Sequence, residues 1–573
     1  MAVDRIIDPG RIPGVRMVRG YRLAQLPQDA IAAIAVTALM IPHGMAYAEL
    51  AGVPAVTGLY TTVAAVLTYA LVGPSRVLLL GPDSSLAPLI AAAIAIVAAD
   101  GDPAEAIAIA GVLALMTGGC CLLVGVLRAG YVAELLSRPV QLGYLNGLAI
   151  VMVASQLSKL CGFSSGGETV PEYLDGFLQG VADGLVNGWA LGLGLACLAV
   201  IGVLGRWWRR VPGVLVAVIG SIAAVELLDL TQRGVPVVGS IPGGFPTPSL
   251  PTVPWDTVPS LLIAALGLTW VTLTDTTALS RGLAARGGDR VNPNSEIMAL
   301  GASNIAAGFF RGFPVSASTS RTTTAQASGG RSQMVGVISA LLIILLLVIG
   351  SGVVESLPNT ALAAVVIAAA VHLFDLPQMI WLYGARRSEF LLCIAATLGV
   401  ILVGVLNGIL IAVALSLGNF VRRLWRPYDA VLGRVENRRG YHDVRRHPDA
   451  RIVPGLLLFR FDAPIFFANA EHFARRVQRA INEYGHRVNR VVIAAEPITD
   501  IDTSGALVLE QLFDDLDAQG IQLGFAELKG PVKDRLDDYG LATRVLEFSD
   551  PTVGKSVSRY LRDHDVDWAD WAD

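Results

Sequence analysis

Long apolar runs, separated by short polar connections, dominate the chain up to residue 425. They begin near Ala30, Val56, Leu86, Ala104, Tyr131, Trp189, Val214, Pro259, Ser295, Ser318, Ser332, Ala361, Phe390 and Asn407. A helix needs about 20 apolar residues to cross a bilayer, and several runs, including those at Leu86 and Ser318, are shorter. The pattern predicts an α-helical polytopic membrane protein with about fourteen spans over residues 30–425, preceded by an N-terminal segment at 1–29.

The pattern changes after Arg426. Runs typical of strands at 452–461, 464–467, 491–495 and 521–526 alternate with helical periodicity at 469–483, 505–518 and 531–539. This alternation predicts a small α/β domain. We expect it at 452–562, with a linker at 426–451 before it and a tail at 563–573 after it.

Composition narrows the class of protein. Hydrophobic residues make up 53% of the 573 and charged residues 16%, which excludes an ordinary soluble protein. The net charge of -4 indicates no nucleic-acid partner, and the five scattered Cys suggest neither a metal site nor a disulfide framework. No nucleotide-binding, zinc or nucleophile-elbow motif is present, so we expect no cofactor and no enzyme activity.

Basic residues favour one side of the membrane. Counting through the spans places most arginines of the connections on the side of the N-terminus, including Arg22, Arg76, Arg128, Arg206, Arg281, Arg386 and Arg422. The opposite connections carry mainly acids, such as Glu168, Glu172 and Glu355. The positive-inside rule then puts both termini in the cytoplasm, in a multi-pass protein of the cell membrane.

Two stretches interrupt short apolar runs in similar ways. Residues 80–88 and 312–321 each combine Gly and Pro with hydroxyl side chains at a predicted helix start. The first amides of a helix have no intrahelical acceptor, and the dipole there is positive, so such a start can bind an anion. A Pro- and Gly-rich loop near 230–255 divides the spans into two halves of about seven. Paired interrupted spans in inverted repeats predict a substrate site near the bilayer midplane.

The hydroxyl and basic side chains at these starts are the candidate anion ligands, namely Ser84, Ser85, Thr319, Ser320 and Arg321. A charge such as that of Arg321 is costly inside a membrane and is usually functional. The alternative is that the stretches are only kinks and that Arg321 extends to the interface.

Asp275 and Asp83 are candidates for coupling to a cation. Asp275 lies in an otherwise apolar span, where a carboxylate must be neutralised, paired or functional. It could hold a coupling cation or proton, or belong to a static pair. Asp83 could share that role, or could only cap the helix that opens at Ser84.

The segment Pro42–Ala48 is expected to break the first span. His43 in this segment could titrate near neutrality or simply pack. Tyr47 could form a wall of the anion cavity or pack between helices. In the α/β domain, Asp502, Thr503 and Ser504 stand between a strand and a helix. They form either a capped helix start or a loop for phosphorylation or nucleotide sensing.

These residues resemble one family over nearly the whole chain. Similar motifs are Pro42–Tyr47, Gly58–Thr61, Gly73–Arg76, Asn292–Glu296, Asn304, Ser320–Arg321, Gly329–Gln333, Phe467–Ala470 and Asp502–Gly505. The chain resembles the sulfate permease family of anion transporters, which is related to the eukaryotic solute-carrier anion exchangers. Its tail resembles a cytoplasmic STAS domain, on which a cytoplasmic regulator could act.

The resemblance implies a seven-plus-seven inverted repeat of uracil-permease type, divided into core and gate domains. It also implies elevator-type alternating access and a homodimer. The anion site would lie between the starts of spans three and ten, with Ser320 and Arg321 facing Ser84 and Ser85, and Tyr47 beside them. Asp275 matches a carboxylate of cation-coupled bacterial members.

Three residues depart from the family pattern. His43 stands where Gln is usual, and Pro74 stands where a small or hydroxylated residue is usual. Leu279 stands where bicarbonate importers have a Thr that coordinates sodium. Because sodium prefers several oxygen ligands, the third departure favours a proton over sodium as the coupling ion.

The sequence therefore predicts a secondary active transporter of small inorganic anions, with sulfate as the first candidate, that works by cation symport. Its partners would be the anion, a proton or sodium ion, and membrane lipid. A bicarbonate or dicarboxylate carrier, an uncoupled anion channel and a receptor are the alternatives. The carboxylate of Asp275 argues against a channel, and the paired interrupted spans argue against a receptor.

Overall fold

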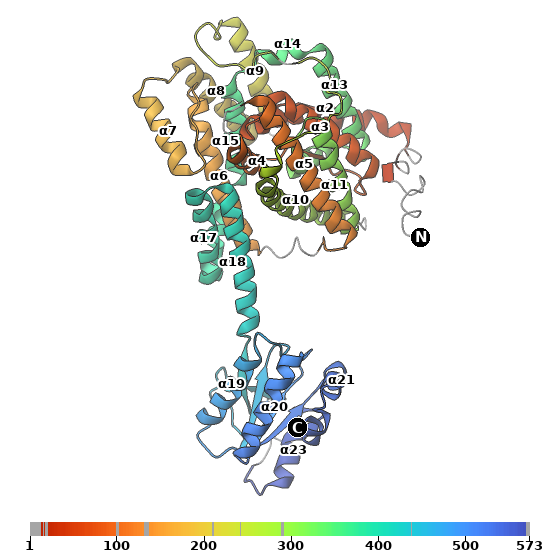
Figure 1. Cartoon of the computed structure of the whole chain (residues 1–573), viewed down its shortest axis with the longest axis vertical. Coiled ribbons are helices and arrows are strands. Elements are labelled where there is room, and N and C mark those ends of the chain that lie inside the picture. Colours follow the sequence, from red (N-terminus) through yellow and green to blue (C-terminus); the bar gives the residue numbers. More distant parts are fainter. Residues whose placement is uncertain are drawn as a thin grey trace. The chain divides into compact units, whose positions relative to one another are not determined.

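The computed structural model describes residues 13–14, 17, 21–98, 102–130, 137–208, 211–240, 242–287, 292–436 and 438–568. The chain divides into two compact units, Met1–Ser416 and Leu417–Asp573. The first unit is helical and the second contains a sheet covered by helices (Figure 1).

A helix occupies each of the fourteen segments that the apolar pattern predicts as spans. These helices are α2 (Leu26–Leu50), α3 (Ala55–Val72), α4 (Ala87–Val97), α5 (Pro103–Val126), α6 (Arg138–Leu160), α8 (Gly188–Trp207), α9 (Gly213–Leu227), α10 (Val258–Gly287), α11 (Pro293–Phe309), α12 (Thr319–Ala327), α13 (Met334–Ile349), α15 (Asn359–Leu373), α17 (Arg387–Val403) and α18 (Val405–Trp425). Connections add the shorter elements η2 (Leu23–Gln25), α7 (Val170–Ala182), η4 (Trp255–Thr257), α14 (Ser351–Glu355) and α16 (Leu376–Ala385). Among the described residues, eight helices are long and apolar enough to cross a membrane.

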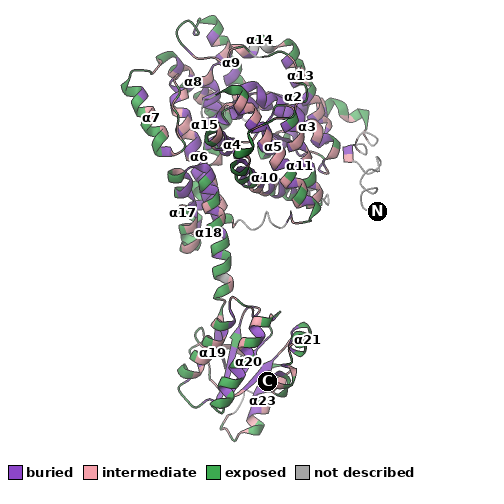
Figure 2. Cartoon of the chain, viewed as in Figure 1, coloured by how far each residue is buried: buried purple, intermediate pink, exposed green. Residues whose placement is uncertain are grey.

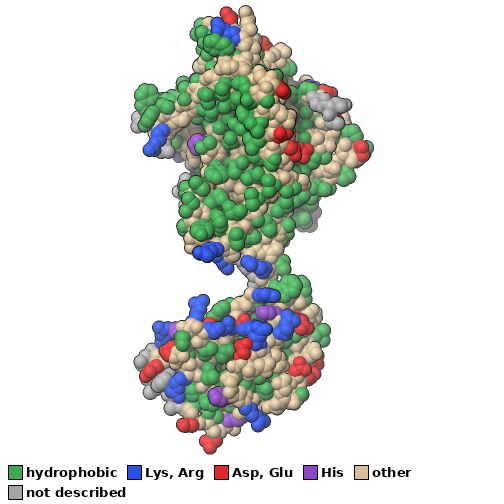
Figure 3. All heavy atoms as spheres, turned by 90° about the vertical axis from the view of Figure 1, so that its left-hand side faces the viewer, with side chains coloured by type: hydrophobic (Ala, Val, Ile, Leu, Met, Phe, Trp, Pro, Cys, Tyr) green, Lys and Arg blue, Asp and Glu red, His purple; other side chains and the backbone are tan. Residues whose placement is uncertain are grey.

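The outer surface of the first unit is apolar. Large side chains such as Trp207, Leu227 and Trp255 are exposed on the folded chain, and hydrophobic side chains cover much of the face in Figure 3. Figure 2 shows that buried residues gather where α2, α3, α5 and α11 meet. Such a surface is stable in lipid, where helices satisfy their own backbone hydrogen bonds.

The helices of this unit form two groups. The first group contains α2, α3, α4, α5, α10, α11, α12 and α13, and the second contains α6, α8, α9, α15 and α17. Small residues allow close packing in the first group: a Cβ on Gly118 of α5 would lie 2.7 Å from the carbonyl oxygen of Gly301 on α11. This grouping corresponds to the expected core and gate division.

Two short strands join the interrupted spans. β1 (Leu80–Gly81) pairs antiparallel with β2 (Ser316–Ala317), with Leu80 opposite Ala317. α4 and α12 follow these strands, so the pairing brings two helix starts together although more than 200 residues separate them. The interrupted spans are therefore as the sequence predicts.

The expected break of the first span at Pro42 is wrong. α2 continues through Pro42 to Leu50. Proline removes one backbone donor and commonly kinks or ends a helix, but here the segment is closely packed: Met40, Pro42, Gly44 and Met45 are buried. Packing along the helix compensates for the lost hydrogen bond.

The second unit is an α/β domain with a six-stranded sheet in the order β4-β3-β5-β6-β7-β8. Its strands are β3 (Asp429–Arg434), β4 (Tyr441–Asp443), β5 (Leu456–Phe461), β6 (Arg490–Ala494), β7 (Gln522–Ala526) and β8 (Ser549–Asp550). Its helices are α19 (Ala470–Glu483), α20 (Thr503–Ala518), α21 (Gly530–Asp538), α22 (Ala542–Glu547) and α23 (Val553–Asp563). β5 to β8 pair in parallel, and β3 pairs antiparallel with β4 and β5.

Two expectations for this unit need correction. The linker predicted at 426–451 contains β3 and β4: β4 forms one edge of the sheet, and β3 lies between β4 and β5. The strand predicted at 464–467 is only an isolated bridge between Ile465 and Ile501. An apolar run of four residues is not enough to distinguish a strand from a buried loop.

Candidate functional site

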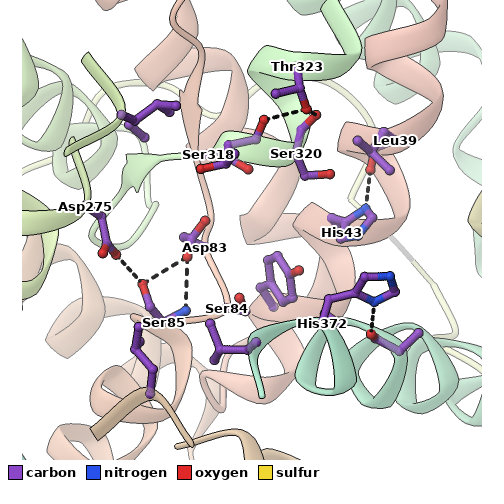
Figure 4. Close-up of a pocket in the computed structure, with 18 of the residues that line it drawn as sticks. Leu39, His43, Asp83, Ser84, Ser85, Asp275, Ser318, Ser320, Thr323 and His372 are labelled. Carbon is purple, nitrogen blue, oxygen red and sulfur yellow. Dashed lines mark hydrogen bonds between the residues drawn. The ribbon is translucent and has the colours of Figure 1, made fainter. Parts of the chain in front are cut away.

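A cavity of about 760 Å³ lies where the two helix starts meet. The first helix group contributes Leu39, His43, Tyr47, Asp83, Ser84, Ser85, Asp275, Ala278, Leu279, Gly282, Leu283, Ala317, Ser318, Thr319, Ser320 and Thr323. The second group contributes Leu145, Ile201, Val214, Val365, Ala368, Ala369, His372 and Leu373. The first group thus supplies most of the polar wall and the second group most of the apolar wall (Figure 4).

Seven of the residues selected from the sequence line this one cavity. They are Tyr47, Asp83, Ser84, Ser85, Asp275, Thr319 and Ser320. They come from α2, the turn before α4, α10 and the first turn of α12. Arg321 is not part of the lining; it lies behind the wall with 2% of its surface exposed.

Two carboxylates approach each other through one hydroxyl. Ser85 Oγ lies 2.9 Å from Asp83 Oδ1 and 2.9 Å from Asp275 Oδ2. The backbone amide of Ser85 also donates to Asp83 Oδ1, at 3.0 Å. Figure 4 shows these hydrogen-bonded groups at one side of the cavity. Asp83 therefore caps the turn that leads into α4, and the same group faces the carboxylate of Asp275.

The guanidinium of Arg321 balances this acidic side. Its Nη2 lies 3.9 Å from Asp83 Oδ2. Its Nε and Nη2 have no hydrogen-bond partner within the described part of the chain. A buried guanidinium with free donors is costly unless an opposite charge lies nearby, and Asp83 provides that charge.

The start of α12 is a capped helix N-terminus. Ser318 caps it, with its hydroxyl accepting from the amide of Arg321 at 3.5 Å. Thr323 closes the turn by donating to the carbonyl oxygens of Thr319 and Ser320, at 2.8 and 3.1 Å. Ser320 lines the cavity (Figure 4), at the end of the helix where the first amides have no intrahelical acceptor.

Polar residues of neighbouring helices hold the irregular backbone before α12. Asn304 accepts from the amide of Val315 at 2.9 Å and donates back to its carbonyl oxygen at 3.2 Å. Thr276 accepts from the amide of Ala317 at 3.3 Å, and Thr272 donates to the carbonyl oxygen of Val315 at 2.8 Å. These bonds fix β2, and with it the position of the helix start.

Two histidines face the cavity from different helix groups. His43 Nδ1 lies 2.8 Å from the carbonyl oxygen of Leu39, and His372 Nδ1 lies 2.7 Å from that of Ala368. Both rings line the cavity, and neither Nε2 has a hydrogen-bond partner among the described residues. His372 and Thr323 are site residues that the sequence reasoning missed. His372 ends an apolar run, and a single His there does not distinguish a cavity wall from a helix end.

The lining chemistry suits a small anion together with a proton or cation. Helix amides and hydroxyls can bind oxygen atoms of an anion, while Asp83 and Asp275 can bind a positive charge. Within the described ranges, no group of three or more His, Cys, Asp or Glu is placed to hold a metal ion.

In the second unit, Asp502 caps α20. Its Oδ1 accepts from the amide of Gly505 at 2.7 Å, and its Oδ2 accepts from the amide of Phe467 at 2.9 Å. Thr503, which is exposed, and Ser504 form the first turn of the helix. The structure thus explains Asp502 by its role in folding, and a regulatory role for Thr503 and Ser504 remains a prediction.

Together, a multi-pass helical unit and a polar cavity between two helix starts define a membrane transport protein. Comparison with known families makes the class specific. Residues 26–396 match the sulfate permease family and residues 447–556 match the STAS domain. The chain belongs to the sulfate permease family of anion transporters.

Named relatives agree with this assignment. A probable sulfate transporter of Mycobacterium tuberculosis is 40% identical over 95% of this chain and 97% of its own length. The chloroplastic sulfate transporter 4.1 of Arabidopsis thaliana is 28% identical over 91% of this chain and 78% of its own length.

Solved structures share the fold. The murine Solute Carrier 26 family member A9 anion transporter, in its inward-facing state, matches with a TM-score of 0.88 at 20% identity, covering 96% of this chain and 94% of that one. The transmembrane domain of a cyanobacterium bicarbonate transporter, BicA, matches with a TM-score of 0.60 at 23% identity, covering 68% of this chain and 98% of that one.

Proposed function

We propose that the protein is a secondary active transporter that carries a small inorganic anion, first of all sulfate, together with protons. One observation carries the proposal: two helix starts meet at a cavity that also contains the carboxylate of Asp275. The sulfate transporters among its relatives support the choice of anion.

Electrostatics connects the anion to a proton. Two like unit charges about 4 Å apart repel by roughly 4 kcal/mol at the effective dielectric near a protein surface. An anion in this cavity faces Asp275 and Asp83, so its binding is opposed unless the carboxylates are neutralised. Protonation of the carboxylates removes that repulsion. The anion and the proton would therefore bind together and move together.

Alternating access would use the two helix groups. The first group holds the polar wall and the second holds the apolar wall. An elevator-type shift of the first group along the second would carry the site, with its helix starts intact, from one side of the membrane to the other. The pairing of β1 with β2 joins the two interrupted spans, which supports movement of the first group as one body.

The arginine distribution supports a place in the cell membrane with both termini in the cytoplasm. The STAS domain would then be cytoplasmic, where a regulator could bind it. A homodimer surrounded by membrane lipid is the assembly we expect.

A bicarbonate carrier is the second candidate, because the fold is shared with a bicarbonate transporter. Leu279, which lines the cavity, offers no oxygen to sodium, and this favours protons. A dicarboxylate carrier and an uncoupled anion channel are further outcomes that the same experiment distinguishes.

The test is uptake of labelled sulfate, bicarbonate or fumarate into proteoliposomes under an imposed proton or sodium gradient, with protein-free liposomes as the control. We expect accumulation of sulfate above its external concentration under an inward proton gradient. Accumulation driven only by sodium, or flux that dissipates a sulfate gradient without following any cation gradient, would contradict the proposal.

A further inference from the structure

The hydroxyl of Ser85 lies between the carboxyl groups of Asp83 and Asp275. A serine hydroxyl has one hydrogen, yet Ser85 Oγ lies 2.9 Å from both Asp83 Oδ1 and Asp275 Oδ2. If it donates to one carboxylate, a full hydrogen bond to the other carboxyl group needs a proton on that second group. The arrangement is therefore best satisfied when one of the two carboxyl groups carries a proton.

The surroundings identify which carboxyl group is protonated. Asp83 accepts a second hydrogen bond, from the amide of Ser85, and its Oδ2 faces the guanidinium of Arg321 at 3.9 Å. Both contacts stabilise an ionised Asp83. For Asp275, by contrast, the structure shows the hydroxyl of Ser85 as partner and no ion pair within the described residues. These contacts point to Asp275 as the donor and to Asp83 as the anion.

We propose that Asp275, Ser85 and Asp83 form a proton relay, with Arg321 as the fixed counter-charge of Asp83. The relay rests on the proposed proton-coupled transport and explains how the proton and the anion influence each other. In one step, the O–H bond of Asp275 breaks as Ser85 gains that proton, while the original O–H bond of Ser85 breaks as Asp83 gains its proton. The negative charge passes from Asp83 to Asp275.

This transfer changes what an anion experiences. Once Asp83 is neutral, Arg321 has lost its near counter-charge, and its field is available to an anion at the helix starts. Uptake of a second proton by Asp275 then makes both carboxyl groups neutral, so that Asp83, Asp275 and Arg321 together carry a net positive charge. By linkage, the anion binds more tightly when the relay is fully protonated, and a bound anion raises proton affinity by the same factor.

Other ionisable groups face the same region. His43 and Tyr47 approach from α2, Tyr144 from α6 and His372 from α15. Within the described residues none of them forms a hydrogen bond to Asp275 or Asp83, so the hydroxyl of Ser85 is the direct link between the two carboxyl groups.

The first test compares Ser85→Ala with Ser85→Thr in the full-length protein in proteoliposomes. Proton-driven sulfate accumulation and sulfate counterflow, which needs no net proton movement, are measured on the same preparation. We expect Ser85→Ala to reduce proton-driven uptake about tenfold more than counterflow, which corresponds to about 1.4 kcal/mol. Ser85→Thr keeps the hydroxyl and should restore the ratio. Equal loss of both activities in Ser85→Ala, or an unchanged ratio, would overturn the relay.

The second test locates the proton without transport. Infrared difference spectra between neutral and alkaline buffer report the C=O band of a protonated carboxyl group. We expect the band of the wild-type protein to be absent in Asp275→Asn and present in Asp83→Asn, after thermal melts have shown that both variants are folded. The reverse pattern would overturn the assignment. If the wild-type protein shows this band but no proton-driven uptake, the proposed function is refuted, while the assignment of a protonated Asp275 is retained.

Discussion

The guanidinium of Arg321 lies directly against the backbone of Gly81. A Cβ on Gly81 would lie 3.0 Å from Arg321 Nη1 and 3.2 Å from Cζ. Gly81 belongs to β1, which pairs with β2 just before the helix that carries Arg321. The absence of a side chain at Gly81 therefore decides where the one buried guanidinium of the described site can lie.

Gly81→Val should displace Arg321 and weaken sulfate binding. The added side chain occupies the space of the guanidinium and separates it from Asp83. We expect a loss of affinity of about tenfold or more, equivalent to about 1.4 kcal/mol. Calorimetric titration with sulfate measures the effect, and Gly81→Ala should give a smaller loss because only one carbon must be accommodated. Wild-type affinity in the Val variant would show that the position of Arg321 does not matter.

Arg321→Ala should strongly weaken sulfate binding and destabilise the protein. Removal of the cation leaves Asp83 as an uncompensated buried charge, and breaking such a pair typically costs about 3–5 kcal/mol. Because 18% of the Asp83 side chain is exposed to solvent, we expect the loss in stability of Arg321→Ala to lie at the lower end of this range. Asp83→Asn in the same chain removes the unpaired charge, so the double variant should regain thermal stability without regaining sulfate binding. Recovery of binding in the double variant would show that Arg321 acts only through Asp83.

Asp275→Asn should uncouple transport. The amide can donate to Ser85 Oγ as the protonated carboxyl group does, so we expect the fold and measurable sulfate binding to survive. It cannot release a proton during the cycle. Proton-driven accumulation should therefore fail, while some sulfate counterflow remains. Full proton-driven accumulation in this variant would end the coupling hypothesis, and loss of folding would instead identify Asp275 as a structural residue.

Truncation should leave a folded membrane unit if the chain ends before the first strand of the sheet. Every residue that lines the cavity lies between Leu39 and Leu373, so a chain that ends after Arg426 should still bind sulfate. A chain that ends after Arg434 retains β3 without its partners β4 and β5, and an unpaired strand promotes aggregation. Size-exclusion chromatography and calorimetry on both truncations check this. A well-folded shorter truncation without sulfate binding would contradict a modular site.

Asp502→Ala should loosen the start of α20. The carboxylate caps the helix and also holds the amide of Phe467, and loss of an N-cap costs about 0.5–2 kcal/mol. Hydrogen exchange in the full-length protein should become faster over residues 503–508, whereas Asp502→Asn, which keeps an acceptor, should change it less. Unchanged exchange in the Ala variant would mean that the remainder of the loop holds the helix start.

Much of the site could be predicted because membrane chemistry restricts polar residues. Asp275 stands out in an apolar span, and stretches with Gly, Pro and hydroxyl side chains interrupt the short apolar runs before Ser84 and Thr319. The cost of a charge or an unpaired backbone group in lipid makes each of them conspicuous. The apolar wall, which includes Leu145 and Val365, could not be predicted. An apolar residue in a span is equally expected whether its side chain faces lipid, another helix or a cavity.

The sequence by itself determined the helical spans, the α/β domain and the chemical types of the site residues, because hydrophobic periodicity and the cost of burying charge act locally along the chain. It did not determine that Pro42 lies within a continuous helix or that β3 and β4 complete the sheet, since packing and strand pairing with distant segments decide both. Only the tertiary structure placed Ser85 between Asp83 and Asp275 and set Arg321 behind the cavity wall. Distances of a few ångströms between segments nearly 200 residues apart depend on how helices pack, and a one-dimensional pattern contains no measure of those distances.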